Sequence, residues 1–154
     1  STQRSTLFPY TTLFRSHAVE FLGLPAALHE RFVFGFCNTA TRLSAESVGR
    51  RYGGGVLKLE PSEAGRVLVP TQKTLAAVRK SSALLKSVDT LLRTGRVREA
   101  SKLADEEVLT GVIGLSADDV LTLACSADRR LAARKGARRR AATAGLSEPI
   151  CPEV

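Results

Sequence analysis

The sequence predicts an α+β fold that is mostly α, in which helices flank a short glycine-rich β segment and a C-terminal helical segment follows. Apolar residues recur at spacings of three and four across residues 26–43 and again after Pro70, which is typical of amphipathic helices. Between these regions, Val56-Leu57-Lys58-Leu59 alternates like a strand directly after three glycines. The length of the chain suits one small domain or part of a larger one.

The N-terminal segment is set aside before the elements are assigned. Residues 6–16 spell TLFPYTTLFRS, and the same eleven residues appear in order in the translation of a common short-read sequencing adapter. We therefore expect residues 1–16 to be an artefactual, adapter-derived segment that carries no information on the fold. The alternative is a genuine Thr-rich strand pair around Pro9-Tyr10. Because the chain also contains no Met, we expect it to be a fragment of a larger protein.

The remaining chain is basic. Removing Arg4 and Arg15 leaves 21 basic and 15 acidic residues, a formal net charge of +6. Such a surplus suits an anionic partner, of which nucleic acid is the first candidate. Seven basic residues and no acidic one lie in residues 129–140, as a phosphate-attracting run or as a solvated helix end.

Membrane and extracellular protein classes are not indicated. No apolar run approaches the roughly 20 residues that a membrane helix needs, so we predict no membrane contact. Cys37, Cys125 and Cys151 form no CxxC pair and no disulfide framework, which predicts buried or inert thiols in the cytoplasm.

The first helical region follows a short apolar segment at residues 17–24. Pro25 suits a helix start, because its missing N–H is not needed in the first turn. Asn38-Thr39 either continues this helix or divides it into two, and the helical run should end near Gly49. The apolar positions that we expect to face inward are Leu28, Phe32, Val33, Phe36, Ala40 and Leu43.

The β region is short. Val56–Leu59 forms the predicted strand, and Pro61-Ser62-Glu63 opens a helical turn with an acid near its positive end. Val67-Leu68-Val69 is a second short strand or an extended run, closed by Pro70.

Three helices are predicted after Pro70. The first should end at Gly95, a suitable left-handed cap, and the second spans residues 97–112 and ends at Gly111 and Gly114. Ser116 and Asp119 form a capping-box pattern that begins the third. The inward positions are Leu75, Val78, Leu85, Val88 and Leu92 in the first helix, Ala100, Ala104 and Val108 in the second, and Val120, Leu123, Ala124, Ala127 and Leu131 in the third. Residues 141–154 are predicted to be a disordered tail.

The sequence contains no recognisable catalytic, cofactor or metal site. Transfer of a methyl group to an exocyclic amine usually needs an Asn/Asp-Pro-Pro-aromatic loop, but the chain has no Pro-Pro pair and its one asparagine is Asn38. The three glycines at residues 53–55 follow a helix and precede a strand, the reverse of a phosphate-binding turn. His17 and His29 have no partners at metal-ligand spacing. Asp118-Asp119 is more simply a helix N-terminus than a pair of catalytic carboxylates.

Residues 50–63, RRYGGGVLKLEPSE, form the most unusual stretch. Its glycines allow close approach of the backbone to a partner, and its cations and tyrosine suit contacts to phosphates and base edges. The alternative is a glycine turn packed inside a domain. The candidate DNA-contacting residues are Arg50, Arg51, Tyr52, Gly53, Gly54 and Lys58.

This stretch resembles a known family. Residues 17–140 are similar to the C-terminal region of adenine-specific (N6) DNA methyltransferases of bacterial restriction-modification systems, closest to the Eco57I-like group. The residues that carry the resemblance are Phe34-Gly35-Phe36-Cys37-Asn38-Thr39, the run Gly49-Arg50-Arg51-Tyr52-Gly53-Gly54-Gly55-Val56-Leu57-Lys58-Leu59-Glu60-Pro61-Ser62-Glu63, and Val67-Leu68-Val69-Pro70.

The resemblance implies a function in DNA recognition. Residues 17–70 would be part of the target-recognition region and residues 71–140 a C-terminal helical segment, which together position double-stranded DNA. The parent enzyme would use S-adenosylmethionine in an N-terminal catalytic domain that this chain lacks. The alternative is a non-enzymatic helical module that binds a partner protein through the stripes Leu75–Leu92 and Val97–Val112.

Overall fold

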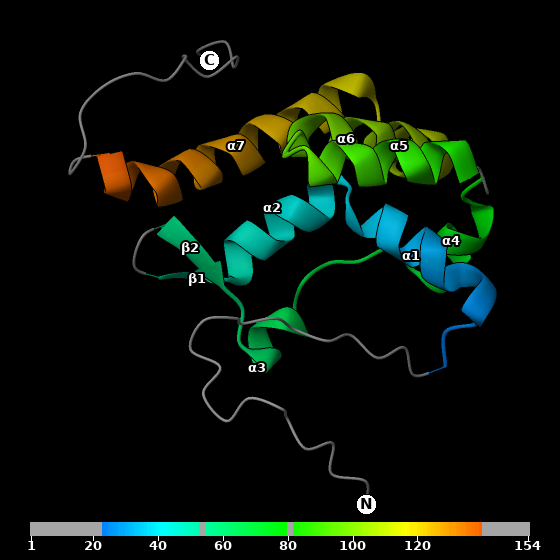
Figure 1. Cartoon of the computed structure of the whole chain (residues 1–154), viewed down its shortest axis with the longest axis horizontal. Helices are drawn as coiled ribbons and strands as arrows, with labels where there is room; N and C mark the ends of the chain where they lie inside the picture. Colours follow the sequence, from blue (N-terminus) through cyan, green and yellow to red (C-terminus); the bar gives the residue numbers. More distant parts are fainter. Residues whose placement is uncertain (1–22, 53–54, 80–81, 140–154) are drawn as a thin grey trace, which may run out of the picture.

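The computed structural model describes residues 23–52, 55–79 and 82–139, and shows a mostly helical chain with one two-stranded antiparallel sheet (Figure 1). This confirms the predicted fold class. The expectations for residues 1–16 and 141–154 lie outside the described residues, as do most of the segment at residues 17–24 and both Gly53 and Gly54. In chain order the elements are the 3-10 helix η1 (Ala26–Leu28), α1 (His29–Phe36), α2 (Thr39–Val48), β1 (Arg50–Tyr52), β2 (Val56–Lys58), α3 (Pro61–Ala64), α4 (Gln72–Ala77), α5 (Ser82–Arg93), α6 (Val97–Ala104), the π-helix η3 (Asp105–Ile113) and α7 (Ala117–Arg139).

The helices pack in pairs around a small core. α5 packs against α6, α2 packs along the long helix α7, and the β1–β2 hairpin lies beside the C-terminal part of α7 (Figure 1). The core cluster joins side chains of α1, α5, α6 and η3 with Val78, which directly follows α4. Its buried members are Phe34, Val78, Val88, Ala100, Ala104, Val108 and Leu109.

The first helical region divides at Asn38, which is one of the two predicted alternatives. The Asn38 side chain accepts a hydrogen bond from the Thr41 N–H at 2.8 Å, so it caps the N-terminus of α2. Asp105 binds the same helix end: its two oxygens accept from the Thr39 N–H and hydroxyl, each at 2.6 Å. A buried carboxylate therefore faces the positive end of α2 from the start of η3.

The predicted single helix from Pro70 to Gly95 is wrong, because the chain forms two helices, α4 and α5. Val78 adopts an extended conformation, and the N–H of Arg79 bonds the Glu107 carboxylate at 2.8 Å instead of continuing the helix. Arg31 donates to the carbonyls of Leu75 and Ala76, which satisfies the end of α4. The apolar spacing fits either arrangement, since a short break changes the direction of the axis without disturbing which side chains face the core.

The second predicted helix continues without a break but changes its winding. α6 passes directly into the π-helix η3, which contains Gly111 and ends at Gly114 in the left-handed conformation, with φ +83°. The predicted end at Gly111 is therefore wrong, and the end at Gly114 is confirmed. Gly95 also has positive φ, as predicted, and the capping box joins Ser116 and Asp119 in both directions.

Most, but not all, of the predicted inward positions are confirmed. Of the stripe after Pro70, Leu85 is half-buried and Leu92 is exposed. In the first region, Val33 and Phe36 are exposed. In α7, Ala127 is buried and the other predicted positions are half-buried.

Of the two predicted alternatives for Val67-Leu68-Val69, the strand is wrong, and the segment is a run outside any strand or helix. The N–H of Leu68 donates to the Ser44 hydroxyl at 2.9 Å, and no strand of the described chain pairs with the segment. Cys37 is a free, half-buried thiol whose pKa is raised by burial.

Asp105 gives a test of this architecture. Asp105→Ala removes the acceptor of two buried donors and should lower the free energy of unfolding by about 3 kcal/mol. Asp105→Asn should stay close to the unchanged protein near pH 4, because an amide, like a protonated carboxyl group, can accept from the Thr39 N–H and donate to its hydroxyl.

The same variants have a pH dependence. Burial raises the pKa of Asp105, against the opposing effect of the Thr39 hydrogen bonds, so the folded state binds this proton more tightly than the unfolded state. The unchanged protein should therefore lose stability relative to Asp105→Asn as the pH rises from about 4 to 7. Urea unfolding at several pH values measures this, and parallel profiles for the two proteins would contradict it.

Candidate nucleic-acid interface

The β1–β2 hairpin presents an exposed surface. Its antiparallel register pairs Arg50 with Lys58, Arg51 with Leu57 and Tyr52 with Val56. All three residues of β1 are exposed, and Tyr52 and Val56 keep 59% and 56% of their surface accessible. The described strand residues of β1 are therefore exposed, whereas Gly55, the one described residue of the glycine turn, is half-buried.

Two of the candidate cations are engaged at the base of the hairpin. Arg50 pairs with Glu63, which also forms a capping box with Glu60 at the start of α3. Lys58 lies 2.6 Å from a Glu60 carboxylate oxygen and 5.5 Å from the centre of the Tyr52 ring. The hydrogen bond and charge of Lys58 lower the pKa of the Glu60 carboxyl group. The pKa of Glu63 is lowered mainly by the hydrogen bond from the Glu60 backbone N–H, and also by Arg50. Arg50 and Lys58 thus hold the hairpin and α3 together as well as adding charge.

Arg51 is the described hairpin cation that is not paired with a carboxylate of the described residues. It is exposed, and among the described residues no carboxylate lies within ion-pair distance of it. It lies across the ladder from Leu57, whose side chain packs against Gly49. A Cβ at Gly49 would lie 2.8 Å from Leu57 Cδ1, so a larger residue at this position would displace the end of the Leu57 side chain. Arg51 and Tyr52 are therefore the candidate residues most available to a partner.

A half-buried ion pair fixes the hairpin to the rest of the molecule. Arg134 of α7 makes a bidentate contact with Glu46 of α2, at 2.9 and 2.6 Å, and its side chain is only 12% exposed. The same guanidinium donates to the carbonyl of Gly55 at the hairpin. Gly55 has φ +74°, and a Cβ there would lie 3.4 Å from the Arg134 carbonyl oxygen. We refer to Glu46, Arg134 and Gly55 as the clamp.

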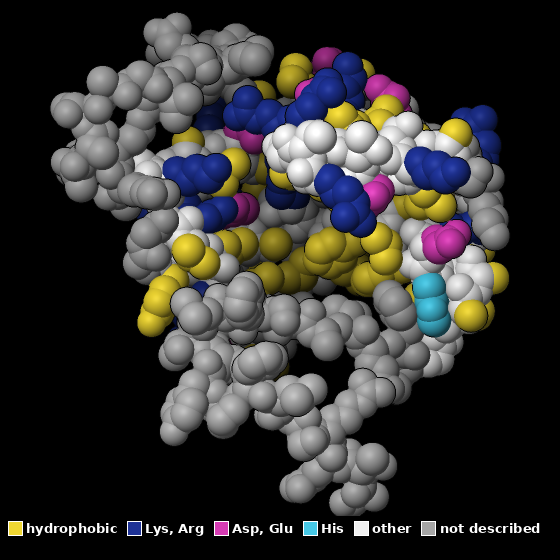
Figure 2. Space-filling view, viewed as in Figure 1, with side chains coloured by type: hydrophobic (Ala, Val, Ile, Leu, Met, Phe, Trp, Pro, Cys, Tyr) yellow, Lys and Arg dark blue, Asp and Glu magenta, His cyan; other side chains and the backbone are white. Residues whose placement is uncertain are grey.

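The clamp brings together two basic segments that are separate in the sequence. Lys135 is exposed beside Gly55, and Arg129 and Arg130 are exposed earlier in α7. Figure 2 shows further Lys and Arg side chains over α5, α6 and α7 on this face, with hydrophobic side chains gathered below them. In the sequence, Arg134 is one of the seven basic residues of 129–140, and its pairing with Glu46 could not be predicted because the two residues are 88 positions apart.

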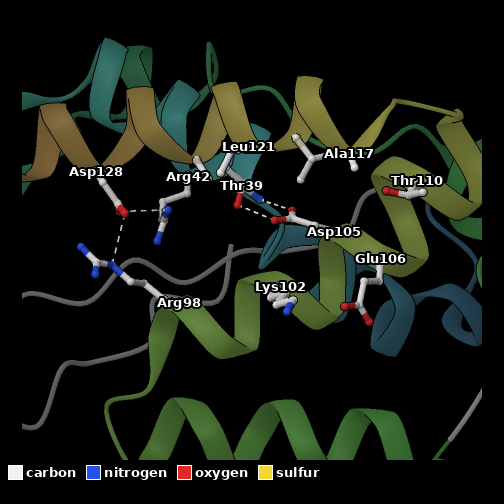
Figure 3. A pocket seen from close by; sticks show the side chains of 12 residues that line it. Thr39, Arg42, Arg98, Lys102, Asp105, Glu106, Thr110, Ala117, Leu121 and Asp128 are labelled. Carbon is white, nitrogen blue, oxygen red and sulfur yellow. Dashed lines mark hydrogen bonds and ion pairs between the residues drawn. The ribbon is translucent and has the colours of Figure 1, made fainter. Parts of the chain in front are cut away.

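A separate cavity lies between α2, α6, η3 and α7, with a volume of about 390 Å³ (Figure 3). Arg42 and Arg98 each lie 3.2 Å from a different oxygen of Asp128 at one end of it. Within the described residues, no cluster of His, Cys, Asp and Glu could hold a metal ion. No described helix is both long and apolar enough to cross a membrane.

A family model matches more than half of the chain. A model of the family described as "Type II methyltransferase M.Eco57I, C-terminal domain" matches residues 11–109, which are 99 of the 154 residues. The match covers the Asn38-Thr39 junction and the hairpin, begins inside the segment attributed to an adapter, and ends in η3 before α7. No curated protein and no solved structure matches the chain.

The clamp gives a test of how the hairpin is held. Glu46→Gln leaves the Arg134 charge buried without its partner and should lower the free energy of unfolding by about 3 kcal/mol in urea titrations. The double variant Glu46→Leu, Arg134→Met replaces the pair with apolar side chains and should recover most of this loss.

Amide exchange separates the two roles of Arg134. The double variant removes the hydrogen bond from Arg134 to the Gly55 carbonyl. The backbone amides of the hairpin should therefore exchange faster in the double variant, although its free energy of unfolding has mostly recovered. Unchanged exchange at residues 55–58 in the double variant would contradict the clamp.

Proposed function

Because the chain belongs to the M.Eco57I C-terminal domain family of Type II methyltransferases, we propose that it recognises DNA for a site-specific adenine-N6 methyltransferase. In this proposal the described residues bind and orient the duplex, and a catalytic domain in another part of the parent enzyme extrudes and methylates the adenine. The target sequence is read by contacts to base edges, and phosphate contacts set the register.

The observation that carries the proposal is an exposed hairpin clamped against the basic end of α7. A two-stranded ribbon fits the major groove of B-form DNA, where base pairs present distinct patterns of donors and acceptors. Arg51 offers a guanidinium to base edges or phosphates, and Tyr52 offers an apolar ring on the opposite face of the ribbon. Lys135 and its basic neighbours on α7 supply attraction to the backbone that does not depend on sequence.

The other candidate contacts have smaller or different roles in this proposal. Arg50 and Lys58 would have to share their charge between DNA and the carboxylates of Glu63 and Glu60. Gly53 and Gly54 lie outside the described residues, and their proposed role remains close approach of the backbone to DNA.

S-adenosylmethionine, the methyl donor of such an enzyme, does not fit the described residues of the glycine-rich turn. The turn connects two strands of a hairpin, whereas nucleotide-type cofactors use a turn that leads from a strand into a helix N-terminus. We therefore assign the cofactor and the chemical step to the remainder of the parent. In this proposal the protein acts on bacterial DNA and therefore works in the cytoplasm.

The alternative of a helical protein-interaction module loses most of its support. Its proposed contact stripes contain Leu75, Val88 and Val108, which are buried in the chain's own core. A partner would have to bind elsewhere on the molecule.

Arg51 and Tyr52 provide the direct test. Arg51→Ala and Tyr52→Ala should each weaken binding to a cognate duplex about tenfold, measured by fluorescence anisotropy with the full chain. Lys73→Ala is the matched control for the lost charge, because Lys73 is exposed on α4, away from the hairpin. Equal losses in all three variants, or none in the first two, would contradict hairpin recognition.

The end of α7 makes a different prediction. Replacing Arg130 and Lys135 together with Ala should weaken binding to cognate and unrelated duplexes alike. The slope of log affinity against log salt should fall by about 2, one unit for each lost phosphate contact. An unchanged slope would exclude these two residues from the interface.

A further inference from the structure

The cavity between α2, α6, η3 and α7 has the properties of a ligand site separate from the hairpin. Its volume of about 390 Å³ lies within the roughly 300–1,000 Å³ of small-molecule pockets. The residues around it are Thr39, Arg42, Arg98, Lys102, Asp105, Glu106, Thr110, Ala117, Val120, Leu121, Ala124 and Asp128. One wall is a π-helix, a form that occurs often at functional sites.

The wall formed by α7 is apolar. Val120, Leu121 and Ala124 line it, and Leu121 is 55% exposed although it is a large hydrophobic side chain (Figure 3). Residues of α7 follow the last residue matched by the family model, so this wall is a feature beyond that match. Such a surface would cover the apolar body of a ligand.

The opposite end of the cavity carries positive charge. Asp128 is shared by Arg42 and Arg98, and Lys102 lies one helical turn beyond Arg98. These four residues, three basic and one acidic, have a net charge of +2. Among the described residues, no carboxylate lies within ion-pair distance of Lys102.

One donor in the cavity is both buried and unsatisfied. The Nε of Arg42 is inaccessible and makes no hydrogen bond within the described structure. A buried N–H without a partner is costly. Because this atom is inaccessible to solvent, a ligand in the cavity would contact the terminal nitrogens of the Arg42 guanidinium instead. Asp105 and Glu106 also line the cavity, so its lining holds three basic and three acidic side chains in all. Glu106 lies away from Arg42 and Arg98, and the carboxylate of Asp105 is directed to Thr39 (Figure 3).

We propose that this cavity binds a small organic anion, with its acidic group toward Arg42, Arg98 and Lys102 and its apolar body on Leu121 and its α7 neighbours. The proposal does not depend on DNA recognition by the hairpin. Binding would tie α6 to α7, because the anion would contact both helices.

A matched pair of fluorescent probes tests the proposal. 8-Anilinonaphthalene-1-sulfonate carries an anionic group on an apolar body, and N-phenyl-1-naphthylamine has nearly the same body without the charge. We expect the full chain to bind the sulfonate at one saturable site, and about tenfold more tightly than the neutral probe. The chain contains no Trp, so no tryptophan emission overlaps the excitation of the probes.

Two variants locate the site. Arg98→Gln with Lys102→Gln should weaken the sulfonate about tenfold and leave the neutral probe unchanged, whereas Leu121→Glu should weaken both. Leu92→Glu on α5 and Lys73→Gln on α4 are the controls, since both side chains are exposed and neither lines the cavity. Thermal unfolding of each variant without probe confirms that it is folded.

The proposal is overturned by any of three results: the two probes bind equally, the sulfonate binds at several unsaturable sites, or Leu92→Glu weakens binding as much as Leu121→Glu. A site that takes the sulfonate normally after Arg98 and Lys102 are replaced would also overturn it.

Discussion

The bidentate ion pair between Glu46 and Arg134 is the interaction on which the arrangement of this molecule depends. It joins α2 to α7, and through the Gly55 carbonyl it also holds the hairpin. Buried charges are retained only when their partners are in place, so the pair specifies one position of the hairpin more than it adds to stability.

The other end of α2 is fixed by a second buried carboxylate. Asp105 binds both the N–H and the hydroxyl of Thr39, and Asn38 caps the same turn. Because Asp105 begins the π-helix, this contact couples the change in helical winding to the position of α2. The two ends of α2 are thus held by residues of the second half of the chain, Asp105 at one end and Arg134 at the other.

Several residues of the family motif have structural roles. Asn38 and Thr39 make a helix junction, and Gly49 admits the side chain of Leu57. Glu63 caps α3 and binds Arg50. These residues build the hairpin and place it. Arg51 and Tyr52 are adjacent in the same motif and are exposed, and in the proposed function they are the residues that contact DNA.

The sequence by itself determined the helical periodicity, the strand after the glycines, the caps at Gly95, Gly114 and Ser116, and the family, because all of these depend on residues close together in the chain. It did not determine the break after Val78, the π-helix, or the burial of Arg134, Glu46 and Asp105. Those features depend on contacts across 28 to 88 residues, such as Arg79 with Glu107 and Arg134 with Glu46. A charged residue has the same local pattern whether it is solvated or paired, and only the packing of distant helices decides which partner it meets.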